Sequence, residues 1–116
     1  MAGLFDSVGA LQGALSFHRA RQMVLAGNVA NVDTPGYKPL DLERVGGGST
    51  QQAGGVRDSY RVFEDSSGLQ DADGNAVNLE RELAKVDANR VRFNTASALV
   101  SRRIALLKYA AADGIG

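Results

Sequence analysis

The 116-residue sequence contains no cysteine, no tryptophan and one histidine, His18. The lack of cysteine excludes disulfides, thiolate metal sites and a cysteine nucleophile, and a single histidine makes a histidine metal site or a Ser-His-Asp triad hard to build. Asp71, Asp73 and Asn75 resemble the start of a calcium loop, but Ala76 stands where that loop requires glycine, so a turn explains them better. We therefore expect no enzyme, no metal site and no cofactor.

The sequence also lacks an excess of charge and a long apolar run. It carries 13 basic and 13 acidic residues, whereas nucleic-acid binding relies on unpaired Lys and Arg. The uncharged stretch near the start, Ser7 to Phe17, has 11 residues, short of the ~20 that a membrane helix needs, and it lacks the basic leader of a secretory signal. We expect no nucleic-acid partner, no small-molecule substrate, no transmembrane segment and no cleaved signal peptide.

Charge and glycine divide the sequence into three parts. Residues 1–32 have a net charge of +1, residues 33–76 of −4 and residues 77–116 of +3, and seven of the 14 glycines lie between residues 46 and 74. Ordering a glycine-rich stretch costs much backbone entropy and buries little surface in return. The middle part is therefore predicted to be a turn followed by a Gly-rich irregular segment with at most a short β-hairpin.

Both end parts repeat apolar residues at alternating steps of four and three, the period of a coiled-coil seam. Two matching helices predict an all-α fold in one structural domain, an antiparallel coiled-coil hairpin of residues 1–32 and 77–116. Asn78 is the expected N-cap of the second helix. Glu80 and Glu82 lie in its first turn, where the helix dipole favours acidic side chains. The predicted seams are Leu4, Val8, Leu11, Leu15, His18, Gln22, Leu25, Val29 and Val32, and Leu79, Leu83, Val86, Arg90, Phe93, Ser97, Val100, Ile104, Leu107 and Ala111.

Two questions about these helices stay open. Gln22 and Arg90 at seam positions either fix the register of the helices or face a water-lined channel in a larger assembly. A second apolar face implies further neighbours, most simply copies of similar subunits. The alternative is a monomeric or dimeric helical adaptor that binds a peptide partner in one groove. The residues of that second face are Met23, Ala26, Ala30, Val91, Leu99, Leu106 and Ala110.

The most distinctive stretch is LAGNVANVDTPGYK, residues 25–38. Its asparagines can bond their own backbone and weaken the helix end, and a residue before proline avoids helical angles. Pro-Gly fits the centre of a type II turn, where glycine supplies the positive φ. The stretch predicts a sharply specified exit from the helix. Its key residues are Asn28, Asn31, Thr34, Pro35, Gly36 and Tyr37.

This motif resembles the signature shared by bacterial flagellar axial proteins of the rod and hook. The stretch from Asp73 to Leu83, with the helix that follows, resembles their C-terminal helix, so the likeness covers about residues 11–41 and 73–110. Residues 33–76 leave no room for the larger β domains of distal members. The Asn89 and Phe93 pair and the ending Ala-Leu-Leu-Lys-Tyr-Ala at 105–110 are similar to the proximal members of the basal-body rod protein family.

The resemblance implies a structural subunit of the proximal rod. Such subunits are exported unfolded through the flagellar type III apparatus without a cleaved signal peptide, and they polymerise helically in the periplasm through their terminal helices to transmit motor torque. The implied partners are copies of the chain, other flagellar rod proteins, and basal-body ring and export-gate-adjacent components. The expected assembly interface comprises Leu11, Leu15, Leu25 and Val29 with Val86, Phe93, Val100, Ile104 and Leu107.

Overall fold

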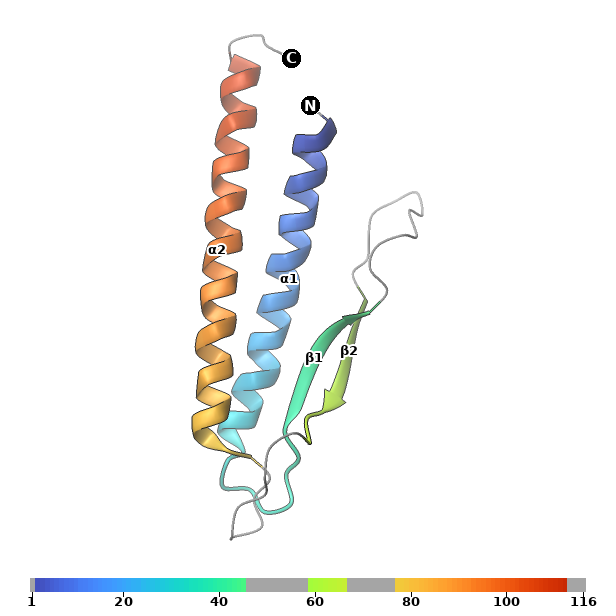
Figure 1. The fold of residues 1–116 in the computed structure, drawn as a ribbon, viewed down its shortest axis with the longest axis vertical. Coiled ribbons are helices and arrows are strands. Elements are labelled where there is room, and N and C mark those ends of the chain that lie inside the picture. Colours follow the sequence, from blue (N-terminus) through green and yellow to red (C-terminus); the bar gives the residue numbers. More distant parts are fainter. Residues whose placement is uncertain (1, 46–58, 67–76, 113–116) are drawn as a thin grey trace.

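The computed structural model describes residues 2–45, 59–66 and 77–112, and contains two long helices beside a two-stranded sheet (Figure 1). In chain order the elements are α1 (Ala2–Ala30), β1 (Leu40–Val45), β2 (Ser59–Glu64) and α2 (Leu79–Ala112). Most of the expected glycine-rich segment, including the acidic stretch around Asp73, lies outside the described residues. The mostly helical fold with one short β-hairpin agrees with the prediction.

The two helices pair in antiparallel fashion, so the start of α1 and the end of α2 lie at the same end of the molecule (Figure 1). Contacts between them confirm this sense, because Gln22 bonds Asn89 whereas Asn28, further along α1, bonds Glu82, which is earlier in α2. The predicted helical hairpin is therefore confirmed. Its supercoiling as a coiled coil stays a prediction.

Local signals in the sequence account for the helix ends that face the turn. The Asn78 side-chain oxygen accepts the Arg81 backbone N–H at 3.0 Å, which makes Asn78 the N-cap of α2 as predicted. Helix α1 ends at Ala30, and the next residue, Asn31, directs its backbone N–H to the Gly27 oxygen at 3.1 Å. The helix thus closes its last turn within the motif, after Asn28 and before the Thr-Pro-Gly turn.

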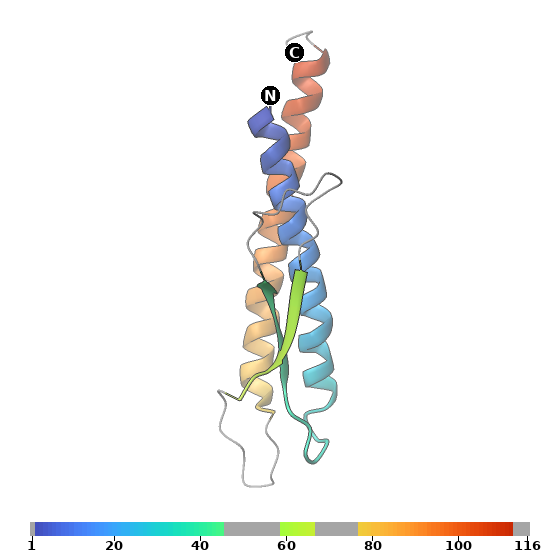
Figure 2. The ribbon, with the colours of Figure 1, turned by 90° about the vertical axis from the view of Figure 1, so that its right-hand side faces the viewer.

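The hairpin of β1 and β2 lies against α1 in the half of the molecule near the turn (Figure 2). Its strands pair in antiparallel register from Leu40 opposite Glu64 to Val45 opposite Ser59. The ring of Phe17 on α1 lies 5.7 Å from the ring of Tyr60 on β2, and Leu42 on β1 is 7% exposed. The hairpin therefore covers a second face of α1, beside the face that packs on α2.

His18 and Gln22 of the predicted α1 seam contact α2, but half of the predicted seam of α2 is displaced by one residue. Val86, Phe93, Val100 and Leu107 are half-buried as expected. The alternate positions are wrong, because Leu83, Arg90 and Ser97 are exposed while their neighbours Glu82, Asn89 and Ala96 are buried. Hydrophobic spacing selects Leu83 over Glu82, yet the burial of Glu82 and Asn89 is made favourable by polar partners on α1.

The core of the described residues is small and unusually polar. Four polar side chains, those of Asn28, Asp41, Glu82 and Asn89, are buried, beside the five buried apolar side chains of Leu25, Pro39, Leu42, Val77 and Ala96. Buried polar groups lower the free energy of folding only when their hydrogen bonds are satisfied. The contacts of these four residues therefore determine how helices and hairpin fit together.

Candidate functional site: the helix junction and the exposed helix faces

Asn28, which is fully buried, connects the end of α1 to both β1 and α2. Its side-chain NH₂ donates to the Leu40 carbonyl at 2.7 Å and to the Glu82 carboxylate at 2.9 Å, and its side-chain oxygen accepts the Leu40 N–H at 2.9 Å. A planar amide that bonds both backbone groups of one residue holds that residue as a neighbouring strand would. Asn28 therefore fixes where β1 starts relative to the helix pair.

The rest of the motif builds the turn between α1 and β1. Asn31 donates from its side chain to the Gly27 carbonyl at 2.8 Å, and the Thr34 hydroxyl donates to the Asn31 side-chain oxygen at 3.2 Å. The Tyr37 N–H then donates to the Thr34 carbonyl at 3.2 Å, and Gly36 between them has φ of 78°. This is the geometry of the predicted type II turn. The structure thus brings the predicted motif residues together in one compact turn.

Arg21 and Asp41 form a bidentate ion pair between α1 and β1. The guanidinium donates to the two carboxylate oxygens at 2.8 and 3.0 Å, and the Leu42 N–H donates to the same carboxylate at 2.7 Å. Burial raises the pKa of Asp41, but the hydrogen bonds from Arg21 and Leu42 and the charges of Arg21 and Lys85 outweigh it, so the pKa lies below its usual value. The hydrogen bond to Asp41 raises the pKa of Arg21.

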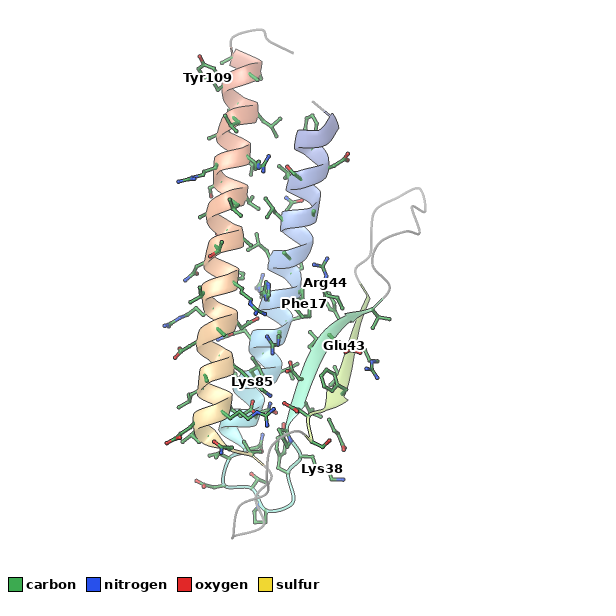
Figure 3. All side chains as sticks on the ribbon, viewed as in Figure 1. Phe17, Lys38, Glu43, Arg44, Lys85 and Tyr109 are labelled. Carbon is green, nitrogen blue, oxygen red and sulfur yellow. The ribbon has the colours of Figure 1, made fainter. Side chains whose placement is uncertain are left out.

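Lys85 of α2 extends this charged cluster to the end of the hairpin, and Figure 3 shows it near the turn end of the helices. Its ammonium group pairs with Asp65, lies 3.4 Å from the Glu82 carboxylate and lies 3.8 Å from Asp41. Arg81 approaches Asp65 at 3.4 Å. The Lys85 ammonium group thus links Asp41 of β1 and Asp65, the residue after β2, to α2. The Arg81 guanidinium offsets part of the negative charge of the three carboxylates.

Asn89 forms the central contact between the two helices. Its NH₂ group donates to the His18 carbonyl at 2.7 Å and to the Gln22 side-chain oxygen at 2.8 Å. Its own side-chain oxygen lies 2.8 Å from Nδ1 of His18. Because both amide hydrogens are already used, that oxygen is the acceptor and His18 Nδ1 carries the proton. Gln22 thus takes part in a register-defining contact, whereas Arg90, also proposed for it, is exposed beside Asp87 on its own helix.

The apolar residues predicted for the assembly interface differ in how far the single chain buries them. Leu25 is fully buried, and Ile104 is 37% exposed near the free end of α2. The remaining seven are half-buried in the chain by itself: Leu11, Leu15, Val29, Val86, Phe93, Val100 and Leu107. These side chains therefore keep part of their surface exposed in the single chain.

Sequence reasoning missed the polar residues that hold the hairpin and the helix pair. Neither Arg21 nor Asp41 had a predicted role, and Glu82 was predicted only as an acid in the first turn, where the helix dipole favours negative charge. Asn89 was noted for its likeness to the family and not as a seam residue. One usable signal was the seven-residue spacing of Glu82, Asn89 and Ala96, one step before the predicted positions.

Apolar side chains on the outward faces of the helices are exposed. Of the residues predicted for a second apolar face, Ala26, Ala30 and Leu99 are exposed and Ala110 is half-buried. The exposed fraction is 74% for Met23, 62% for Val91 and 56% for Leu106. Within the described ranges neither helix has a stretch apolar enough to cross a bilayer, and acidic or histidine side chains form no group of three suited to a metal ion.

Comparison with known proteins relates this sequence to a family. The family described as "Flagella basal body rod protein" matches residues 10–38, which include the second half of α1 and the turn motif. The flagellar basal body rod protein FlgB of Aquifex aeolicus is 34% identical over 101 residues, 79% of this chain and 82% of the relative. The FlgB proteins of Cereibacter sphaeroides and Aeromonas hydrophila are each 30% identical, over 90% and 93% of this chain and 92% and 96% of theirs.

The chain belongs to the flagellar basal-body rod protein family. As a rod family protein it has a structural role in the flagellar basal body and is not an enzyme. The family match ends at Lys38, so it includes the whole turn from Asn28 to Tyr37 and stops just before Asp41. The relatives match α2 as well, since they cover most of the chain.

Proposed function

We propose that the chain is a subunit of the proximal rod that polymerises helically through its terminal helices and transmits motor torque. One observation carries the proposal: the polar contacts described above cluster in the half of the helix pair near the turn, while large apolar side chains on both helices are exposed. The first half fixes the shape of one subunit. The exposed apolar surface is what further copies would bury.

The energetics of the free subunit support assembly. Burying a Leu or Met side chain contributes about 1.5–3 kcal/mol, but Met23, Leu99 and Leu106 are 39–74% exposed, so much of that free energy is not gained in the single chain. The half-buried seam residues from Leu11 to Leu107 would also complete their burial between neighbours. A subunit that is marginal alone and stable in the polymer suits export in an unfolded state, without a cleaved signal peptide.

Torque transmission requires that the hairpin and helices move as one body. The bidentate Arg21–Asp41 pair and the Lys85 cluster join the hairpin to both helices through short, directional contacts. Such contacts resist sliding better than apolar packing alone, because their energy falls steeply with misalignment. We propose the same partners as for other rod subunits: copies of the chain, other rod proteins, and ring and export-gate-adjacent components of the basal body.

The test is far-ultraviolet circular dichroism with sedimentation velocity over a concentration series of the purified chain. We expect low helicity at micromolar concentration that rises as larger species form. Leu106→Asn should move the rise to higher concentration, whereas the nearby control Lys108→Asn should not. Full helicity and cooperative melting independent of concentration would contradict coupled folding and assembly, and would favour the helical adaptor.

A further inference from the structure

Two joints of different chemistry hold the chain together. The helix joint, where α1 meets α2, is centred on the amide of Asn89, which contacts His18 and Gln22. The hairpin joint, where the hairpin meets both helices, consists of charged side chains: Arg21 of α1, Asp41 of β1, Asp65 just after β2, and Arg81 and Lys85 of α2. An amide therefore carries the first joint, and carboxylates carry the second.

The charged side chains of the hairpin joint are largely shielded from water. Their exposed fractions are 17% for Arg21, 10% for Asp41, 15% for Lys85 and 12% for Asp65. Ion pairs elsewhere on the hairpin have side chains that are 45–68% exposed. Removing one partner of a shielded pair is strongly unfavourable, because it leaves an uncompensated charge away from water. The hairpin joint therefore depends on the ionised state of its two aspartates.

Protonation of the aspartates removes the charges that keep the cations of the hairpin joint in place. The Arg21 and Lys85 side chains lie 2.8 and 3.8 Å from the Asp41 carboxylate, and both keep their positive charge in acid. Once Asp41 is neutral, two cations remain close together where water hardly reaches them. The apolar contacts under the hairpin, such as the ring pair of Phe17 and Tyr60, cannot offset those charges. Movement of the hairpin away from the helices lets water solvate both cations.

The helix joint does not need an ionised group. The Asn89 NH₂ group donates to the His18 carbonyl and to the Gln22 side-chain oxygen, and neither acceptor titrates. The Asn89 oxygen accepts from Nδ1 of His18, and protonation of the other ring nitrogen leaves that donor in place. Glu82 of α2 contacts Asn28 of α1 at 2.9 Å, and a protonated carboxyl group still has an oxygen that accepts this bond. Acid therefore leaves the helix joint with its hydrogen bonds.

We infer that the hairpin joint is an acid-sensitive latch: protonation of Asp41 and Asp65 releases the hairpin from the helix pair while α1 and α2 stay paired. Although burial opposes the ionisation of Asp41, the hydrogen bond from Arg21 holds its pKa below the usual value of about 4, so the latch opens only in acid. Release uncovers the face of α1 around Phe17 without unfolding the chain. The latch goes beyond the proposed function and does not depend on it, because its contacts lie within one chain.

Two pairs of spin labels, attached to introduced cysteines in a chain that has none, report the two joints separately. Ser16→Cys with Val62→Cys measures the distance from α1 to β2, and Ser16→Cys with Ser101→Cys measures the distance from α1 to α2. All three positions are exposed. Labelled full-length chain is mixed with a large excess of unlabelled chain, so that the distances are those within one molecule. Pulsed electron paramagnetic resonance and circular dichroism are then recorded between pH 7 and pH 2, at a concentration where the chain is helical.

Two double variants identify the carboxylates. Asp41→Asn with Asp65→Asn removes both charges at nearly constant side-chain shape, so it should release the hairpin already at pH 7. The control, Glu43→Gln with Glu64→Gln, also removes two carboxylates of the hairpin, but their ion-pair partners lie outside both helices. The control should keep the hairpin in place at pH 7 and release it in acid as the natural chain does.

We expect the distribution of α1–β2 distances to widen about twofold or more in acid, while the α1–α2 distribution and the helicity stay nearly constant. An unchanged α1–β2 distribution would overturn the latch, and so would loss of both distances and of helicity in one step. The latch would also be refuted if the double asparagine variant matched the control at pH 7. Loss of the helices in that variant at pH 7 would show that the two joints are not separate, which again contradicts the latch.

Discussion

Replacing Asn28 with alanine should detach the hairpin from the helix pair. The substitution removes two hydrogen bonds to Leu40, at 2.7 and 2.9 Å, and one to Glu82 at 2.9 Å. It leaves the Leu40 N–H, the Leu40 carbonyl and a buried carboxylate oxygen without their partner. Such a group costs about 1–3 kcal/mol when fully buried, and the two Leu40 groups, whose bonds are only part-buried, fall at the lower end of that range. Since Asn28 is fully buried, we expect a loss of about 3–6 kcal/mol, a large part of the stability of a small domain.

The assay is urea unfolding followed by circular dichroism, at a protein concentration where the natural chain is helical. Asn31→Ala is the matched control, because Asn31 lies in the same turn but is only half-buried, and its side chain bonds only the Gly27 carbonyl and the exposed Thr34 hydroxyl; its cost should be about 1 kcal/mol. Asn28→Asp keeps the side-chain volume and places a second carboxylate beside Glu82, so it should destabilise at least as much as alanine. A loss below about 1 kcal/mol for Asn28→Ala would refute the reasoning.

Three further predictions test other contacts. Asn89→Ala should cost about 2–4 kcal/mol in the same urea assay because it removes the bonds to His18 and Gln22, while exposed Arg90→Ala should change stability by less than about 0.5 kcal/mol. Because folding lowers the pKa of Asp41, the stability that its ion pair with Arg21 contributes is present above about pH 4 and is lost as the pH falls through the folded-state pKa. Asp41→Asn should therefore weaken the fall in melting temperature between pH 7 and pH 2. An unchanged fall would show that the Arg21–Asp41 pair does not contribute to stability. Gly36→Ala should cost about 1–2 kcal/mol of stability, since φ at Gly36 is 78°. Gly9→Ala, in open space on α1, should instead stabilise the unassembled chain by about 0.5–1 kcal/mol. Equal effects of the two substitutions on the melting temperature would contradict this account of the turn.

The helices, their antiparallel pairing and the turn could be predicted because local chemistry dictates them. The alternating apolar steps specify helix faces, Asn78 specifies the start of α2, and Gly36 specifies the turn type. Each of these signals lies within a few residues of the feature it determines. The short hairpin has no such local signal, because the pairing of residues 40–45 with residues 59–64 joins parts that are distant in sequence. The sequence therefore predicted at most one short hairpin and did not give the positions of its strands.

Every second position of the predicted α2 seam lies one residue after the residue that is buried, as Leu83 lies after Glu82. The reason is that burial was inferred from hydrophobicity. Leu83 is 44% exposed while Glu82 is 2% exposed. A sequence cannot reveal that a glutamate will be buried unless its partners, here Asn28 and Lys85, are known to meet it in space. The same holds for Arg21 and Asp41, which are 20 residues apart in sequence and form one bidentate pair.

The division of polar and apolar contacts is what the proposed assembly requires of one chain. Contacts such as those of Asn28 and Asn89 are directional, and each has only one set of partners, so they allow one register of helices and hairpin. The exposed apolar side chains of Met23, Val91 and Leu106 have no such directional requirement, because the free energy of apolar burial depends on the area removed from water and not on alignment. A chain held in one shape by buried amides can therefore keep that shape while the proposed neighbours cover its apolar faces.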